Sequence, residues 1–375
     1  MASPDGILRL GKPDPALVQV LMDVKAAGNA VALISNHTEP DWFETAFSSS
    51  KVQFLQVRGR QTGGIVAHNA SLHSLNPFDV LVLATKDDDV RMGKNGGAIL
   101  IAGAWSASPL VRDLGISVQN AQQLQEVVEL TAKWSGKWWF AAENPKYCIR
   151  ALADLSGFGK SNTQQNFAQK LTNTVKNGGS RLNALLAVTA RSLLTDGFGA
   201  KKDLVWGVYP SSKSVNTDTE VLSDFTHRLR TTVSRVRFCK RGEPLFIRHK
   251  PSIKRSTGGG GDRTDPTDQI TSIHLNPFYK EKRRLRGANV IVIDDCTTYG
   301  VSFGVASAFL RAAGAVSVTG IALGKFGSQL RAYDITILSD PFEPVQLGQF
   351  KSAPPAFFSG GVDANAQTDL HTILQ

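Results

Sequence analysis

The stretch of sequence that decides the fold lies at residues 289–302 and reads NVIVIDDCTTYGVS. Its apolar, mostly β-branched beginning predicts a buried strand, and the apolar spacing after it predicts a helix over 301–313. Two adjacent carboxylates, Asp294 and Asp295, therefore stand at the carboxyl end of a strand, where open α/β sheets bind ligands. The hydroxyl-rich loop that follows suits a phosphate, because free backbone N–H groups gather at a helix N-terminus.

An ordinary buried strand followed by a capped helix is the simpler interpretation of this stretch. That interpretation leaves the paired acids unexplained, because two carboxylates so close together repel one another. The stretch resembles the signature of type I phosphoribosyltransferases, which bind phosphoribosyl pyrophosphate. The resemblance implies that Asp294 and Asp295 are the catalytic and metal-binding pair, contacting the ribose 2′- and 3′-hydroxyls directly or through a hydrated Mg²⁺ ion.

The same resemblance assigns the 5′-phosphate of the ligand to the loop after the acids. The loop residues are Thr297, Thr298, Tyr299, Gly300, Val301 and Ser302. Tyr299 departs from the family pattern, in which a small Thr or Ala is usual. Lys325 and Phe342 fall at later strand ends, where family members often contact the base. Many proteins with this signature bind without catalysis, so both an active transferase and a silent binding protein are open.

The pyrophosphate of such a ligand needs a loop of its own at the end of another strand. Residues 204–209, LVWGVY, predict that strand, and a turn rich in serine follows it. The turn residues are Ser211, Ser212, Lys213 and Ser214. This turn resembles the pyrophosphate loop of the competence-protein-F-like branch of the family. Taken alone, a serine-rich turn is most often only a turn.

A glycine-rich segment lies between these two loops. Residues 250–268 read KPSIKRSTGGGGDRTDPTD, and four consecutive glycines do not hold a fixed structure without a partner. The position fits the loop that closes over the reacting pair in type I enzymes and excludes water. Lys254, Arg255 and Arg263 would then reach the departing pyrophosphate. A surface linker without a role is the alternative.

Positive charge is concentrated in one part of the chain. The formal net charge is +10, and residues 225–290 hold 16 Lys or Arg against 5 Asp or Glu. Such clustering favours a polyanionic partner, either a multiply phosphorylated small molecule or nucleic acid. A solvated surface face is the alternative.

The first hundred residues carry a different set of motifs. Strand-like runs at 30–34 and 80–83 alternate with helical spacing, and this alternation resembles phosphatases of the haloacid-dehalogenase type. Matched on that family's motifs, Asp5 is the general acid, Ser35 the phosphate-binding hydroxyl and Asp89 the last acid of the Mg²⁺ cluster. An unrelated small α/β domain is the alternative.

The haloacid-dehalogenase motifs are incomplete in this chain. Ser3 stands where the family has its nucleophilic aspartate, and Ala84-Thr85 replaces the Gly-Asp that begins the metal cluster. An unactivated serine does not replace a carboxylate in forming a phospho-enzyme. Loss of a metal acid also weakens Mg²⁺ binding. We therefore expect this domain to be inactive.

Together these patterns predict an α/β protein with two doubly wound parallel-sheet domains. The expected parts are a haloacid-dehalogenase-like domain at 1–120, an aromatic linker and helical segment at 121–200, a phosphoribosyltransferase-like domain at 201–350 and a loosely ordered tail at 351–375. Within the second part, residues 145–199 show helical spacing. The tail is rich in Pro, Gly and Ala.

Cysteine usage and hydropathy bear on the compartment. The three cysteines show no metal-ligand spacing and fit a reducing cytosol. Neither a signal peptide nor an apolar run of membrane-spanning length is visible, so we expect a cytoplasmic protein without membrane contact.

The expected function is binding of phosphoribosyl pyrophosphate with Mg²⁺ and transfer of ribosyl phosphate to a nitrogen acceptor. The alternative is a catalytically silent component of a larger complex that binds a nucleotide or sugar phosphate, or associates with nucleic acid through residues 225–290. The sequence leaves an oligomer open as well.

Overall fold

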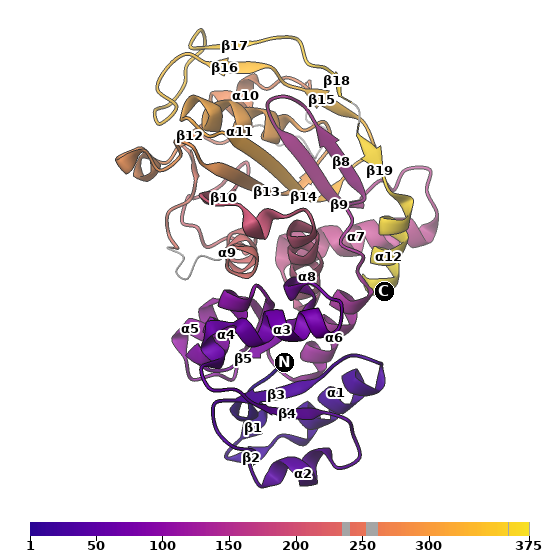
Figure 1. The fold of residues 1–375 in the computed structure, drawn as a ribbon. Helices are drawn as coiled ribbons and strands as arrows, with labels where there is room; N and C mark the ends of the chain where they lie inside the picture. The colour runs from indigo at the N-terminus through magenta and orange to yellow at the C-terminus, as the bar shows by residue number, and fades with distance from the viewer. Residues whose placement is uncertain (235–240, 253–261, 359, 375) are drawn as a thin grey trace. The chain divides into compact units, whose positions relative to one another are not determined.

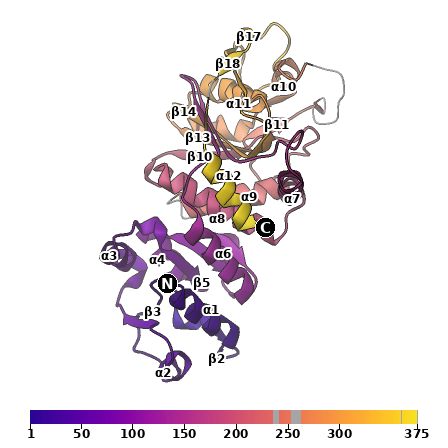
Figure 2. The same cartoon turned by 90° about the vertical axis from the view of Figure 1, so that its right-hand side faces the viewer.

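The computed structural model describes residues 1–234, 241–252, 262–358 and 360–374, and the chain divides into two compact units. Unit 1 comprises Met1–Gly136, Ser180–Gly199 and Arg228–Cys239, whereas unit 2 comprises Lys137–Gly179, Ala200–His227 and Lys240–Gln375. Figures 1 and 2 show the helices and strands in two views. Each unit is assembled from separate segments of the chain, whereas the domains expected from the sequence are continuous ranges, so those ranges stay predictions.

Unit 1 is built on parallel strands. These are β3 (Ala32–Ser35), β4 (Gln53–Gln56), β5 (Leu81–Ala84), β6 (Ile99–Gly103) and β7 (Ile116–Val118). β3 pairs with β4, and β6 pairs with both β5 and β7. Ala2 forms parallel bridges to Leu33 and Leu83, so the first residues of the chain lie between β3 and β5. Every residue of β3 and β6 is buried, as expected for parallel strands covered on both faces.

Buried polar contacts tie the helices of unit 1 together. The helices are α1 (Pro15–Ala26), α2 (Trp42–Phe47), α3 (Gly64–Leu72), α4 (Asp87–Gly96), α5 (Pro109–Asp113), α6 (Ala121–Lys133), α8 (Ser180–Thr195) and the second half of α9 (Val221–Val233). Trp134, after α6, donates from its indole Nε1 to Ser192 Oγ of α8 at 2.8 Å. Lys94 of α4 donates to the carbonyls of Thr231 and Ser234, which close α9 and have no partner inside the helix.

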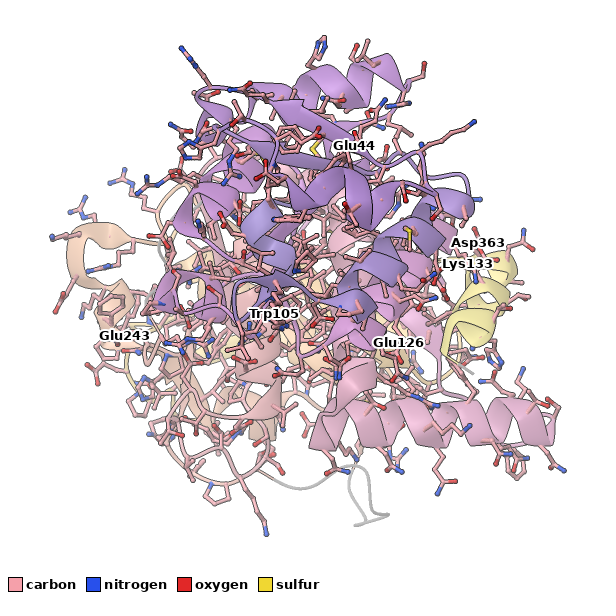
Figure 3. All side chains as sticks on the ribbon, turned by 90° about the horizontal axis from the view of Figure 1, so that it is seen from below. Glu44, Trp105, Glu126, Lys133, Glu243 and Asp363 are labelled. Atoms are coloured by element: carbon pink, nitrogen blue, oxygen red, sulfur yellow. The ribbon has the colours of Figure 1, made fainter. Side chains whose placement is uncertain are left out.

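The start of the chain is fixed by a tryptophan of unit 1. Residues 4–7 form the 3₁₀ turn η1 (Pro4–Ile7), followed by the short antiparallel pair β1 (Leu8–Arg9) and β2 (Lys12–Pro13). Trp105 is labelled in Figure 3. Its Nε1 donates to the carbonyl of Gly6 at 3.1 Å, and the guanidinium of Arg9 lies 4.0 Å from its ring centroid. These contacts hold residues 3–5 at one edge of the unit 1 strands.

Unit 2 is built on a six-stranded sheet of order β10-β13-β14-β9-β8-β19. The strands are β8 (Phe140–Glu143), β9 (Cys148–Asp154), β10 (Leu204–Val208), β13 (Asn289–Thr297), β14 (Ser317–Lys325) and β19 (Gly361–Val362). β10, β13, β14 and β9 are parallel, and β8 is antiparallel to both of its neighbours. The protein is therefore an α/β protein with parallel sheets and one mixed sheet. The sequence predicted parallel sheets alone, but the short 144–147 connection from β8 to β9 permits only antiparallel pairing.

Helices lie on both faces of the six-stranded sheet (Figure 1). Val292 of β13 shares a buried core with Phe309 of α11 (Val301–Ala312). Ile293, its neighbour in sequence, points to the opposite face because side chains alternate along a strand. On that face α7 (Asn162–Asn177) packs against β13 and β14. The strand that carries the paired acids is thus central and covered on both sides.

Unit 2 also contains two-stranded antiparallel pairs. β11 (Phe246–Arg248) pairs with β12 (Ile273–Leu275), β15 (Leu330–Ala332) with β18 (Ala356–Phe358), and β16 (Ile335–Ile337) with β17 (Phe350–Ser352). The glycine-rich segment belongs to the excursion between β11 and β12, which also includes α10 (Thr267–Ile270).

Two segments differ from their sequence prediction. Residues 148–154 were expected to be helical but form strand β9, of which Ile149 and residues 151–153 are buried, because a short Ala/Leu run has no period that separates the two structures. The predicted tail contains α12 (Ala364–Leu374), whose first turn is capped by Asp363 Oδ1 accepting from the amide of Asn365 at 2.9 Å. Leu370 of α12 is fully buried. Composition alone did not reveal this cap.

Close packing of α11 on β14 provides a test of the fold. At Gly320 of β14 an added Cβ would stand 2.4 Å from Cδ1 of Phe303 in α11. Gly320→Ala should therefore destabilise unit 2 by about 1–3 kcal/mol, because the ring is fully buried and has no room to move. The urea-unfolding midpoint measures this. Gly157→Ala, whose Cβ would meet Gln165 Cγ at 3.7 Å, is the control, and equal midpoints for the two variants would contradict the packing.

Candidate functional site

Two loops leave the same edge of the unit 2 sheet. β10 and β13 are parallel neighbours in a register that pairs Val208 with Ile293. The serine loop (residues 210–214) follows β10, and the acidic loop (residues 294–302) begins within the last residues of β13. Because β10 ends opposite Ile293, the residue directly before the paired acids, the serine loop leaves the sheet beside them at its carboxyl edge. The structure thus brings together two motifs that lie far apart in the sequence.

The paired acids of the acidic loop are held by their neighbours. Asp294 Oδ2 accepts from Ser302 Oγ at 2.7 Å, and Asp294 Oδ1 accepts from the amide of Asp295 at 2.9 Å. Asp295 Oδ1 accepts from the amide of Cys296 at 2.6 Å. Burial, and then the nearby charge of Asp295, raise the pKa of Asp294 well above its ordinary value. The ionised form of the pair is therefore unfavourable in the free protein, and a cation or a set of hydroxyl donors would stabilise it.

The acidic loop turns into α11 through a glycine. Gly300 has a φ of +82°, and its amide donates to Thr297 Oγ1 at 3.1 Å. The backbone conformation favours glycine, and a Cβ at this position would make a tight contact of 3.0 Å with Leu330 Cδ2. The turn leaves the first amides of the twelve-residue α11 at the loop, which also carries the hydroxyl residues Thr298 and Ser302. This arrangement suits a phosphate group.

Lys325 at the end of β14 supports the acidic loop from beneath. It was expected to face a base, but its side chain is fully buried. Its Nζ donates to the carbonyls of Thr298 at 3.0 Å, Gly327 at 2.6 Å and Gln329 at 2.7 Å. Burial lowers its pKa to about 8. Phe342, the other residue expected at a base, is also buried.

The acidic loop contains a cysteine with no nucleophilic character. Burial, followed by the charges of Asp295 and Asp294, raises the pKa of Cys296 above its ordinary value. The thiol therefore stays protonated at neutral pH, and only a thiolate is an effective nucleophile. The carbonyl of Tyr299, the residue that departs from the family pattern, accepts from the amide of Arg331 at 3.1 Å. The backbone of the loop is thus held although its side chain is large.

The serine loop is a compact turn stabilised by its own backbone. The amide of Ser214 donates to the carbonyl of Ser211 at 3.1 Å, and Ser214 Oγ accepts from the amide of Asn216 at 3.2 Å. The carbonyl of Ser212 accepts from the amide of Ser252 at 3.1 Å. Lys213 is exposed at the tip of the turn. The predicted residues of this loop are therefore at the sheet edge, together with the segment that follows β11.

A buried arginine lies under the serine loop, and sequence reasoning did not single it out. Arg248 is 4% exposed. Its Nη2 donates to the carbonyl of Pro210 and to Gln269 Oε1, both at 3.1 Å, and its Nη1 donates to Ser272 Oγ at 2.7 Å. Its Nε has no hydrogen-bond partner, and no carboxylate among the described residues pairs with it. An arginine cannot lose its charge, so this site calls for an anion.

The predicted closing segment begins at the same edge. Lys254 and Arg255 lie outside the described residues. Arg263 is described and lies shortly before α10. On the other side of the gap, the buried Oγ of Ser252 has no hydrogen-bond partner among the residues that the structure describes. Because the amide of Ser252 binds the serine loop, the segment departs next to the candidate site.

The motif residues of unit 1 form a separate cluster. Asp89 is fully buried, and its Oδ2 accepts from Ser3 Oγ at 3.0 Å and from the amide of Thr85 at 2.9 Å. Asp5 is exposed and pairs with Lys86. Ser35 Oγ accepts from the amide of His37 at 3.0 Å, a contact within its own turn. The bridges of Ala2 to β3 and β5 bring these residues to one edge of the strands.

An arginine that the sequence did not point to completes the unit 1 cluster. Arg60 Nη1 lies 2.5 Å from Asp89 Oδ1, and both side chains are buried. Asp89 therefore has its charge balanced by a side chain. Within the residues the structure describes, no group of three or more His, Cys, Asp or Glu side chains is arranged to hold a metal.

Comparison with known proteins gives no relative: no family model, no curated protein and no solved structure matches this chain. Across the described residues, no helix combines the length and apolar character needed to cross a membrane. Function must therefore be inferred from the sites themselves.

Because Asp294 is buried, replacing it with a neutral residue should stabilise the folded protein by an amount that depends on pH. The pKa of Asp294 is raised in the folded protein, so the folded state holds a proton that the unfolded chain has already lost. Stability is thus lost as pH rises from the unfolded pKa through the folded one. Asp294→Asn should therefore be more stable than wild type at pH 7, on the order of 1 kcal/mol. The gain should shrink as the pH is lowered toward about 4, the lower end of that window. Asp369→Asn, in α12, is the control in thermal melting, and a gain for Asp294→Asn that does not depend on pH would contradict this assignment.

The unit 1 ion pair predicts an asymmetric pair of variants. Arg60→Met leaves the carboxylate of Asp89 buried without a counter-charge and should cost about 3–5 kcal/mol of stability. The double variant Arg60→Met/Asp89→Asn should recover part of that loss, because the uncompensated charge is gone. Arg58→Met, at an exposed position, should change stability by less than about 0.5 kcal/mol. Chemical unfolding measures all three, and a double variant less stable than Arg60→Met would refute a charge effect.

Proposed function

We propose that unit 2 is a phosphoribosyltransferase-like domain that binds phosphoribosyl pyrophosphate with Mg²⁺. The observation that carries the proposal is that the serine loop leaves the sheet beside the acidic loop and holds Arg248 against it, a buried cation with no acidic partner among the described residues. One edge of the sheet thereby offers a carboxylate pair, a helix N-terminus and a cationic turn. Phosphoribosyl pyrophosphate carries two hydroxyls, one phosphate and one pyrophosphate, which match these three features.

The ribose phosphate part of the ligand would occupy the acidic loop. Asp294 and Asp295 would accept hydrogen bonds from the 2′- and 3′-hydroxyls, which relieves the charge repulsion between them. The 5′-phosphate would bind the first amides of α11 and the hydroxyls of Thr298 and Ser302. Lys325 acts as a positioning residue, because its ammonium fixes the carbonyl of Thr298.

The pyrophosphate part would occupy the serine loop. Ser211, Ser212 and Ser214 supply hydroxyls and amides, and exposed Lys213 supplies a mobile cation. Arg248 supplies a fixed positive charge beneath them, and within the described ranges neither its Nε nor the Ser252 Oγ makes a hydrogen bond. Such a preorganised cationic site stabilises charge that develops on a leaving group.

The acids of the acidic loop fit Mg²⁺ as the metal. Mg²⁺ is usually held by one or two carboxylates plus substrate phosphates, and not by an all-protein cage. Asp294 and Asp295 provide two carboxylates, and burial makes their mutual repulsion costly unless a cation or donor is bound. A bound Mg²⁺ would supply positive charge next to the pyrophosphate.

If the domain is catalytic, the reaction is displacement at the ribose C1. The bond from C1 to the pyrophosphate oxygen breaks, pyrophosphate leaves with the bonding electrons, and a bond from C1 to a nitrogen acceptor forms while that nitrogen gives up a proton. The residues of this chain would hold the two ends of the ligand and leave C1 between the loops. Segment 250–268 would then exclude water from the reacting centre.

A silent binding domain is the second candidate, and the state of unit 1 favours it. We propose that unit 1 is a haloacid-dehalogenase-like domain without phosphatase activity. One support is the strand order, in which β4, β3, residue 2, β5, β6 and β7 are successive neighbours. The other is that Ser3 lies beside Asp89, while the guanidinium of Arg60 pairs with Asp89 and takes the space next to this carboxylate that a metal would need. A chain in which one unit has lost its chemistry could retain only binding in the other.

Isothermal titration with phosphoribosyl pyrophosphate and MgCl₂ tests the proposal. Wild type should bind, and Asp294→Asn/Asp295→Asn should weaken binding at least about tenfold, since each lost charge-assisted contact costs about 1.5–3 kcal/mol. Arg248→Met should weaken binding of inorganic pyrophosphate by a similar factor. Lys160→Gln, on the exposed turn before α7, is the control.

The outcomes separate the two candidates. Pyrophosphate release in the presence of nitrogen acceptors indicates an active transferase, and binding without release indicates the silent domain. Absence of binding by wild type, or equal binding by wild type and the double variant, would overturn the proposal. Circular dichroism spectra should confirm that each variant is folded.

A further inference from the structure

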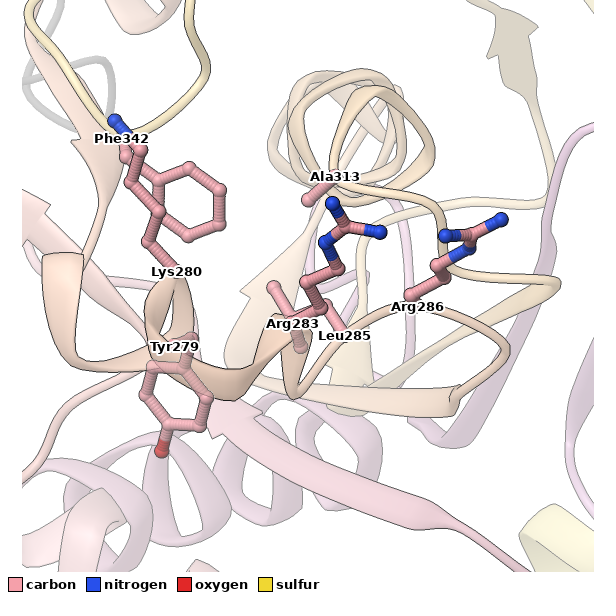
Figure 4. A pocket seen from close by; sticks show the side chains of 7 residues that line it. All are labelled: Tyr279, Lys280, Arg283, Leu285, Arg286, Ala313 and Phe342. Carbon is pink, nitrogen blue, oxygen red and sulfur yellow. The ribbon is translucent and has the colours of Figure 1, made fainter.

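A basic cavity lies at the end of β13 opposite the acidic loop (Figure 4). Its volume is about 210 Å³, and it is lined by Tyr279, Lys280, Arg283, Leu285, Arg286, Ala313 and Phe342. The chain passes from this cavity into β13 at Asn289 and reaches the acidic loop only at the strand's other end. Nine residues of extended strand span about 26 Å, at about 3.3 Å per residue, so the cavity is a separate place on unit 2.

The cations of the cavity are largely uncompensated. Residues 280–286, which we call the basic turn, read KEKRRLR. Lys280 is paired with Asp340 at 2.6 Å, and Glu343 is also near it. For the exposed Lys282, Arg283 and Arg286, the described part of the chain offers no ion pair. The basic turn therefore presents positive charge to an outside partner despite the acids around Lys280.

Aromatic rings lie next to these cations. The guanidinium of Arg284 lies 3.9 Å from the ring centroid of Phe278, and the rings of Tyr279 and Phe342 line the cavity. Figure 4 shows the side chains of Arg283 and Arg286 lying together beside the cavity. A surface that offers both cations and ring faces suits a chain of phosphates and bases.

The backbone of the basic turn is held in an uncommon conformation. Lys282 and Arg283 have φ values of +54° and +51°, the left-handed region that residues with side chains rarely adopt. The turn is anchored by buried Leu285 and by Tyr279, whose hydroxyl donates to the carbonyl of Glu243 at 2.8 Å. A strained backbone persists only where the surrounding structure holds it. Here these anchors hold the backbone of two consecutive cationic residues, Lys282 and Arg283.

We propose that the basic turn and its cavity bind single-stranded nucleic acid, a function beyond the one proposed for the acidic loop. Backbone phosphates would contact Lys282, Arg283 and Arg286, and a base would enter the cavity beside Tyr279 and Phe342. The turn contains one short 3₁₀ segment, Glu281–Arg283, and offers no α-helix or strand to enter the groove of a duplex. Its cations spread over several residues, which matches a chain of phosphates better than a single compact anion.

Fluorescence anisotropy with labelled oligo(U) and oligo(dT) of twenty nucleotides tests the proposal. Wild type should bind at least one of them, and Arg283→Glu/Arg286→Glu should weaken binding by roughly tenfold or more. Loss of two phosphate contacts should also make the salt dependence, log Kd against log salt, shallower by about 1.4, at about 0.7 per contact for single strands. Arg283→Lys/Arg286→Lys should keep most of the affinity.

A matched control separates a local site from general charge. Lys160→Glu/Lys170→Glu makes the same change in net charge at two other exposed positions of unit 2 and should keep wild-type affinity within about threefold. Equal losses in the two charge-reversal variants, no binding by wild type at low salt, or tighter binding of a duplex would each overturn the proposal. Titration of Arg283→Glu/Arg286→Glu with phosphoribosyl pyrophosphate should match wild type, so a failure here and a failure at the acidic loop are distinguishable.

Discussion

The parallel pairing of β10 with β13 is the constraint on which the candidate site of unit 2 depends. Its register ends β10 opposite Ile293, directly before the acids of β13, and the serine loop therefore leaves the sheet next to those acids. β13 is in turn held between β10 and β14, with a helix on each face. A shift of one residue would turn the buried side chains of β13 to the wrong faces, so the core fixes the position of the acids.

The buried lysines and arginines differ in the groups that compensate their positive charges. Lys94 and Lys325 donate to backbone carbonyls, and Arg60 is paired with a carboxylate. Arg248 has neutral oxygens as its partners and an Nε without a hydrogen bond. A lysine can relieve its burial by losing a proton, as the lowered pKa of Lys325 indicates, but an arginine cannot. This difference makes Arg248 the buried charge that most clearly calls for a ligand.

The sequence predicted features that depend on neighbouring residues, but not those that depend on an ambiguous short run or on contacts between residues far apart in the chain. The strand at 289–297 and the helix after it follow from the order of apolar residues and one glycine with positive φ. β9 was missed because a short Ala/Leu run fits either structure, and the α12 cap was hidden by composition. Arg60 and Arg248 carried no signal at all, since an arginine in a turn or a short strand is usually exposed.

The sequence by itself determined the paired acids, the hydroxyl loop before α11, the serine loop and the concentration of basic residues, because each is a run of neighbouring residues. The tertiary structure decided which of these lie together. It placed the serine loop beside the acids, Arg248 beneath that loop, Arg60 against Asp89 and the basic turn at the far end of β13. These contacts join residues tens of positions apart, and only the pairing of strands and the burial of side chains brings them into reach.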